Sequence, residues 1–179
     1  MGKKVYVDCK FKWPKVREED RDMGQDDGSE ASAKIKSTQG QYIVHLYIDK
    51  EAKEKMIADG VPNTGLQANL FKEDAEGKDY FKATRPHFNP RFTNKETGEK
   101  GVIMGPPKVY KGETGEDGNP LPWDYEQDGL WGNWSKGVAK LDVWSSNKPK
   151  MKGKDITTLE ALLITDPVPY EDSQDDGGF

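Results

Sequence analysis

The chain has 179 residues, of which 33% are hydrophobic and 33% charged, and its formal net charge is −5 at pH 7. This length suits one domain, and the low apolar content predicts a thin core with long solvated loops. No apolar run approaches the roughly 20 residues that cross a bilayer, and no signal-peptide h-region is present, so we expect neither a membrane span nor secretion. The single Cys9 and two distant histidines leave no internal disulfide and no zinc-ligand spacing, so we expect a cytoplasmic protein without metal or cofactor.

Acidic residues are concentrated in three stretches, 16–33, 112–128 and 166–179. These stretches hold 18 acidic residues and two basic ones, whereas the rest of the chain holds 14 acidic and 25 basic ones. Binding depends on local potential rather than on total charge, so the body of the chain suits a polyanion in spite of the negative sum. We interpret residues 1–165 as one domain and residues 166–179 as a flexible acidic tail.

The first third of the chain predicts two strands and a helix. Lys3–Trp13 alternates between apolar and polar residues, as a half-buried strand does. Pro14–Gly40 is acidic and nearly free of apolar residues, which indicates a long mobile loop. Gln41–Ile48 is apolar on both faces and predicts a central strand, and Asp49 is a suitable N-cap for a short helix over Lys50–Asp59. The inward set of the first strand is Val5, Val7, Cys9, Phe11 and Trp13.

The rest of the chain predicts further short strands separated by polar loops. Lys78–Thr84 alternates, and the two prolines of Arg85–Phe92 favour extended backbone. Gly101–Tyr110 predicts a strand interrupted at its proline pair, followed by an acidic loop. Ser135–Trp144 alternates again, and Ile156–Ile164 is the most apolar stretch, typical of a buried strand.

This pattern predicts an all-β fold with one or two short helices. Five or six short strands, one helix after the second strand and long loops fit the five-stranded OB-fold barrel best, with a flexible acidic C-terminal tail. An immunoglobulin-like sandwich is the alternative, although seven strands are hard to count.

Three tryptophans accompany a run of lysines between residues 129 and 154. Exposed rings stack on the bases of a single strand, and lysines neutralise its phosphates. Each tryptophan could instead pack in the core or at the barrel end, and each lysine could belong to an ordinary solvated face. The candidate DNA-binding residues here are Trp131, Trp134, Lys136, Lys140, Trp144, Lys148, Lys150 and Lys152.

A second basic and aromatic cluster follows the third predicted strand. In an OB-fold, the face of the second and third strands and the two loops beside it bind oligonucleotides, which would place both clusters at the edge of that groove. The candidate DNA-binding residues of this cluster are Lys82, Arg85, Phe88 and Arg91.

An enzyme is not expected, because no nucleophile with a base, phosphate loop or carboxylate cluster has a suitable spacing. Asp142 and Glu160 lie on neighbouring predicted strands, where they could meet. A salt bridge from these carboxylates to Lys140 or Lys154 explains them more simply than catalysis does.

The order of these elements resembles the single-stranded DNA-binding proteins of short-tailed bacteriophages. The shared features are a basic and aromatic strand, a lysine loop, one very apolar strand and an acidic tail that ends in Phe179. The resemblance extends over most of the chain and is most specific over Ser135–Phe179. It implies an OB-fold protein of the bacterial host's cytoplasm that coats single strands during phage replication, recombination and annealing.

The resemblance also assigns roles to residues. It implies a homodimer formed through the tail, and recruitment of a phage DNA polymerase and a primase-helicase by the same tail. The groove role carries over to Lys136, Lys140, Trp144, Lys148, Lys150 and Lys152. The partner-binding role carries over to Glu171, Asp172, Asp175, Asp176 and Phe179.

The segregation of charge suggests that the acidic tail competes with DNA for the basic groove. A second hypothesis is an OB-fold or sandwich module that binds a protein or an oligosaccharide through its tryptophans, without nucleic acid. A nuclease is a third class, which the missing carboxylate cluster disfavours.

Overall fold

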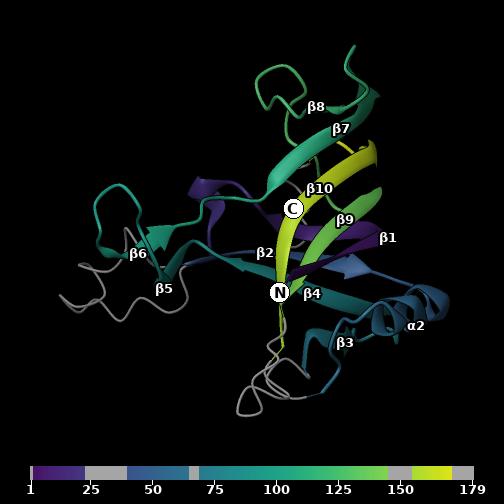
Figure 1. The fold of residues 1–179 in the computed structure, drawn as a ribbon. Helices are drawn as coiled ribbons and strands as arrows, with labels where there is room; N and C mark the ends of the chain where they lie inside the picture. The colour runs from purple at the N-terminus through teal and green to yellow at the C-terminus, as the bar shows by residue number, and fades with distance from the viewer. Residues whose placement is uncertain (1, 23–39, 65–68, 145–154, 171–179) are drawn as a thin grey trace, which may run out of the picture.

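The computed structural model describes residues 2–22, 40–64, 69–144 and 155–170, which form a β-rich fold (Figure 1). The α-helix among these residues is α2 (Lys50–Ala58), and η1 (Glu18–Asp20) is a single 3-10 turn. The strands of the described residues are β1 (Gly2–Lys15), β2 (Gln41–Tyr47), β3 (Phe71–Glu73), β4 (Asp79–Pro86), β5 (Phe88–Thr93), β6 (Lys100–Ile103), β7 (Lys108–Thr114), β8 (Pro120–Pro122), β9 (Ser135–Trp144) and β10 (Ile156–Asp166).

Eight of the described strands form one curved sheet in the order β3-β4-β2-β1-β9-β10-β7-β8. Its five central strands follow the OB-fold path, because β1 pairs with both β2 and β9, β4 extends β2, and β10 extends β9. The curvature brings β10 near β4, while the sheet of described strands stays open because no ladder pairs these two strands. The predicted all-β, OB-fold-like class with one short helix is confirmed.

The core forms where the alternating apolar residues of the central strands meet. Phe11 of β1, Leu46 of β2, Phe81 of β4 and Leu141 of β9 have no exposed surface. Each fully buried side chain of this size contributes about 1.5–3 kcal/mol by leaving water. The predicted inward set of β1 is confirmed from Val5 to Phe11, whereas Trp13 is 43% exposed.

Helix α2 begins where the sequence predicts and ends one residue earlier, at Ala58, with Asp59 as its C-cap. Asp49 Oδ1 accepts a hydrogen bond from the Ala52 N–H at 2.7 Å, and Gly60 follows the helix with a φ of 113°. Met56 is buried in the core and anchors the helix against the sheet. In the described part of the chain, no helix combines the length and apolarity that a membrane crossing requires.

Two short strands, β3 and β8, lie in segments for which no strand was predicted. β8 pairs with β7 inside the stretch predicted to be an acidic loop, and β3 pairs with β4 at the opposite edge of the sheet. Both have three residues, too few for a periodic pattern. The predicted mobile loop after β1 starts as packed structure, since Val16 is 4% exposed and η1 follows it. The rest of that loop, residues 23–39, lies outside the described residues.

β9 and β10 approach each other closely at Gly137. A Cβ atom at this position would collide with the backbone carbonyl oxygen of Leu163 and would crowd the ring of Phe11. Gly137 is therefore required for the antiparallel pairing of these two strands.

We predict that Gly137→Ala lowers the free energy of unfolding by about 3 kcal/mol, because β10 must shift to admit the methyl group. Urea denaturation of both proteins measures the difference. Gly112→Ala is the matched control, since a Cβ atom there meets its nearest neighbour, Thr165 Cα, at 3.4 Å. Equal effects of the two substitutions would contradict the tight β9–β10 approach.

Candidate nucleic-acid interface

The outer face of β1, β2 and β4 carries rings in the middle and lysines at the sides. The strand register places Lys12, His45 and Lys82 in one row across the three strands. It places Lys10, Tyr47 and Tyr80 in the next row, with Lys72 of β3 beyond Tyr80. Neighbouring strands lie about 4.8 Å apart, so the side chains of a row are in contact distance.

The rings of these rows form a continuous series with Trp134. His45 stacks on Tyr80 with 4.6 Å between ring centroids, and Tyr80 stacks on Tyr47 at 5.3 Å. Trp134 then meets Tyr47 edge to face at 5.0 Å. We call the five residues Trp13, His45, Tyr47, Tyr80 and Trp134 the aromatic face.

Lys12 lies between the two tryptophans of the aromatic face. Its Nζ is 4.8 Å from the centroid of Trp134, 5.1 Å from that of Trp13 and 5.7 Å from that of Tyr47. Lys78 Nζ lies 5.5 Å from the Trp134 ring. Such cation–π contacts contribute about 0.5–1 kcal/mol each at exposed sites, so Lys12 holds the two indoles in a fixed relation.

A backbone clasp positions the tryptophans. The Trp134 N–H donates to the Phe11 carbonyl at 2.7 Å, and the Trp13 N–H donates to Asn133 Oδ1 at 2.8 Å. Trp13 has a φ of 54° and Trp134 a φ of 73°, and among the described residues no other non-glycine φ is positive. This conformation costs roughly 1–2 kcal/mol per residue and is typical of functional sites.

Lysines surround His45 of the aromatic face, whereas a carboxylate, Asp74, lies beside Tyr47. The pKa of His45 is below its ordinary value of 6.5, first because of burial and then because of Lys82, Lys12 and Lys72. Burial raises the pKa of Tyr47 to about 12, together with a hydrogen bond from its hydroxyl to Asp74 Oδ2 at 3.1 Å. The lysines therefore act on His45, whereas burial and Asp74 act on Tyr47.

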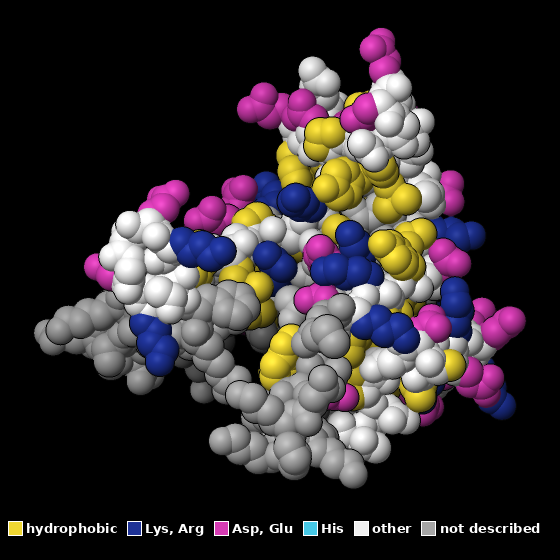
Figure 2. Space-filling view, in the orientation of Figure 1, with side chains coloured by type: hydrophobic (Ala, Val, Ile, Leu, Met, Phe, Trp, Pro, Cys, Tyr) yellow, Lys and Arg dark blue, Asp and Glu magenta, His cyan; other side chains and the backbone are white. Residues whose placement is uncertain are grey.

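A groove of about 860 Å³ lies over β9, β10 and the base of the β5–β6 hairpin. It brings together four residues that the sequence singled out as DNA-binding: Arg85, Phe88, Lys140 and Trp144. Figure 2 shows Lys and Arg side chains across the middle of this face, with acidic ones among them. The predicted salt bridge is present, since Lys140 Nζ lies 3.8 Å from Glu160 Oε1.

Arg85 fastens the barrel where β4 meets β10. Its guanidinium donates to the carbonyls of Gly105 at 2.9 Å, Met104 at 3.1 Å and Leu159 at 3.3 Å. These bonds use three of its five N–H groups. Desolvation lowers the pKa of Arg85, and the predicted DNA contact of this residue stays a prediction.

The other predicted site residues are dispersed. Trp131 is 4% exposed and packs edge to face on Phe11, so the alternative of core packing is the one observed, and this indole is not a stacking platform. Lys82 and Trp134 belong to the aromatic face or its border, and Lys136 is exposed on β9 opposite Lys10. Arg91 belongs to β5. The side chain of Arg91 is not among those described. Outside the described residues lie Lys148, Lys150, Lys152, Glu171, Asp172, Asp175, Asp176 and Phe179.

Sequence reasoning missed most of the aromatic face and the lysine beside it. His45, Tyr47, Tyr80 and the neighbouring Lys12 each lie on the outward side of a predicted strand, but the sequence does not say which strands are neighbours. Aligning the outward residues of the first three strands in OB-fold order would have brought them together. Trp13 could not be found in this way, because its positive φ turns it out of the alternation.

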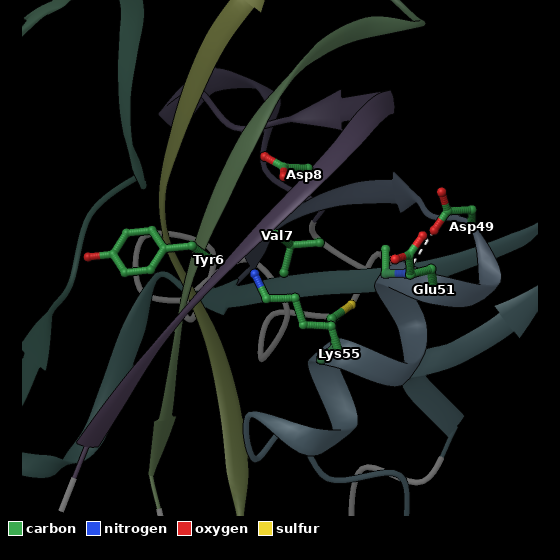
Figure 3. A pocket seen from close by; sticks show the side chains of 8 residues that line it. Tyr6, Val7, Asp8, Asp49, Glu51 and Lys55 are labelled. Atoms are coloured by element: carbon green, nitrogen blue, oxygen red, sulfur yellow. Dashed lines mark hydrogen bonds between the residues drawn. The ribbon is translucent and has the colours of Figure 1, made fainter.

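A smaller pocket of about 250 Å³ lies between β1 and the start of α2 (Figure 3). Its lining includes the carboxylates of Asp8, Asp49 and Glu51, and Lys55 alone is basic among the described residues around it. These carboxylates would repel phosphate, so this pocket is not part of the interface. Among the described residues, no three His, Cys, Asp or Glu side chains are placed so that they could hold a metal ion together.

Comparison with known proteins relates this chain to two phage proteins. The structure is similar to that of gp2.5, a single-stranded DNA binding protein encoded by bacteriophage T7, with a TM-score of 0.53 and 16% sequence identity over 98% of this chain and 93% of that chain. This likeness establishes the fold. The single-stranded DNA-binding protein from bacteriophage Enc34, in complex with ssDNA, gives a TM-score of 0.49 and 15% identity over 92% of this chain and 86% of that chain.

No family model and no curated protein matches the sequence. The structural neighbours are nevertheless phage single-stranded DNA-binding proteins, so the resemblance stated from the sequence is confirmed at the level of the fold.

We predict that Trp13→Gly destabilises the fold less than Trp144→Gly does. The two losses in the free energy of unfolding should differ by about 1–2 kcal/mol. The two indoles are similarly exposed, at 43% and 37%. Glycine relieves the positive φ at position 13, whereas at position 144 it weakens an ordinary strand. Urea denaturation measures both losses, and equal losses would show that residue 13 is unstrained in solution.

Proposed function

We propose that this chain binds single-stranded DNA, with little dependence on base sequence and without catalysis. The observation that supports this most is the aromatic face with lysines on both sides. Three of its rings lie on the second and third strands of the barrel, β2 and β4, where OB-folds bind oligonucleotides. Trp13 of β1 and Trp134 before β9 adjoin them.

The chemistry of a single strand matches this surface. Base stacking on an aromatic ring is worth about 1–3 kcal/mol per base and tolerates any base, because every base has a π-face. Trp13 and Trp134 are the most exposed rings of the face. The strand's phosphates are then left for Lys12, Lys78 and Lys82. Among the described residues, Lys78 alone of these three forms an ion pair, with Glu76 at 3.8 Å.

The same proposal includes the groove residues Phe88, Lys140 and Trp144, and Lys136 between the groove and the aromatic face. It also includes a role in phage replication, recombination and annealing in the host cytoplasm. The acidic residues that precede Phe179 would compete with DNA and recruit a DNA polymerase and a primase-helicase. The uneven charge of the chain and the family resemblance support these roles.

We predict that Trp134→Ala weakens binding of a fluorescent oligo-dT by about 1–3 kcal/mol, because one stacking ring is lost. The slope of log affinity against log salt should stay the same, since stacking releases no counterions. Lys82→Met should instead make that slope shallower by about 0.7, the value for one phosphate contact on a single strand. Fluorescence anisotropy at several salt concentrations measures both effects.

Leu130→Ala is the control, because this apolar side chain is 40% exposed outside the aromatic face. It should leave both affinity and slope unchanged. No binding by the parent chain, or binding that ignores salt and Lys82, would contradict the proposal. Binding that depends on Trp134 but not on salt or Lys82 would favour an oligosaccharide or protein ligand.

A further inference from the structure

Two lysines of the groove, Lys4 and Lys140, form ion pairs with carboxylates that line the same groove. Lys4 Nζ lies 2.9 Å from Glu160 Oε2 and 3.3 Å from Asp142 Oδ1. Lys140 Nζ lies 3.8 Å from Glu160 Oε1. Glu160 is the main cause of the raised pKa of Lys4. Two lysines that line the groove are thus engaged by two carboxylates on its floor.

The remaining lining of the groove suits a nucleic acid strand. Trp144 is 37% exposed there, and Phe88, Tyr110 and Lys108 lie around the same hollow. Rings for bases are therefore present, whereas the charges for phosphates are partly neutralised from within.

A ridge that is basic except for Asp8 joins the groove to the aromatic face. The register of β1 and β9 places Tyr6 opposite Lys140, Asp8 opposite Val138 and Lys10 opposite Lys136, on the outer side of both strands. Lys12, beside the aromatic face, follows Lys10 along β1. From Lys4 to Lys12 the ridge extends at most about 26 Å, at roughly 3.3 Å per residue. That length corresponds to about eight nucleotides at a stacked spacing of about 3.4 Å.

We propose that the groove is a second segment of the strand-binding surface, and that Asp142 and Glu160 act there as internal competitors of the DNA phosphates. This inference rests on the proposed function. A strand long enough to cross the ridge places phosphates beside Lys4 and Lys140, and these lysines exchange their carboxylate partners for phosphate. A strand that covers only the aromatic face leaves all three ion pairs intact.

The exchange is feasible because the ion pairs are partly exposed. The side chains of Lys4 and Lys140 are 44% and 35% exposed, and that of Glu160 is 32% exposed. Exposed pairs of this kind are weak, and salt weakens them further. Asp142 and Glu160 thereby make affinity depend on strand length, since the groove adds little to binding until several phosphates reach it together.

The test compares oligo-dT of about 20 nucleotides with oligo-dT of about five, which lie near the two ends of the site sizes of OB-folds. Glu160→Gln frees Lys140 and leaves Lys4 with Asp142. The ratio of long-strand to short-strand affinity should rise up to about fivefold at low salt, the most that one exposed pair is worth. The salt slope for the long strand should steepen by about 0.7.

Two variants separate this exchange from a general change in charge. Glu54→Gln changes the net charge by the same amount as Glu160→Gln, but at an exposed position of α2 outside the groove. It should leave the ratio of long-strand to short-strand affinity at the parent value. Lys140→Met added to Glu160→Gln should return the ratio to the parent value. Thermal unfolding of each variant checks that the fold is intact.

An unchanged ratio in Glu160→Gln, while the parent chain binds both oligonucleotides, would overturn this inference and leave the proposed function in place. An equal rise in Glu54→Gln would overturn it as well, because the effect would then be one of net charge. Failure of the parent chain to bind either oligonucleotide would overturn the proposed function and this inference with it.

Discussion

The backbone clasp between the end of β1 and the segment before β9 is the interaction on which the aromatic face depends. Two hydrogen bonds, Trp134 N–H to Phe11 and Trp13 N–H to Asn133, tie these segments together. They offset the cost of two tryptophans at positive φ. Without the clasp, either indole could turn toward the core, as Trp131 does beside them. The clasp thus keeps apolar surface exposed that a fold would otherwise bury.

Acidic and basic side chains occupy different parts of the fold. The carboxylates of the stretch 112–128 lie around the β7–β8 hairpin, and Glu51 and Glu54 lie on α2, while lysines line the aromatic face and the ridge along β1. A net charge of −5 therefore coexists with a strongly basic surface, because phosphate responds to charges within about a Debye length. Carboxylates also lie among these lysines: Asp142 and Glu160 in the groove, Asp8 on the ridge and Asp74 beside Tyr47.

The sequence predicted the long elements of this fold well and the composition of its site only in part. β1, β2, β9, β10 and α2 were predicted because each is long enough to show its period or has an N-cap. β3 and β8 were missed because pairing with a neighbour, rather than pattern, creates strands of three residues. The aromatic face depends on cross-strand register and on the positive φ of Trp13, which are properties of the tertiary structure. The sequence singled out Arg85, Phe88, Lys140 and Trp144, which line the groove, because basic and aromatic residues gather in two short segments.

Photo-cross-linking tests the central claim most directly, since it reports which side chains touch the bases. The chain is irradiated with oligo-dT at low salt, and the adducts are located by peptide mass spectrometry. We expect adducts on the peptides that carry Trp13, Tyr47, Tyr80 and Trp134, which β1, β2, β4 and the segment before β9 supply. Adducts confined to α2 or to the β7–β8 hairpin would contradict the aromatic face as the nucleic-acid interface.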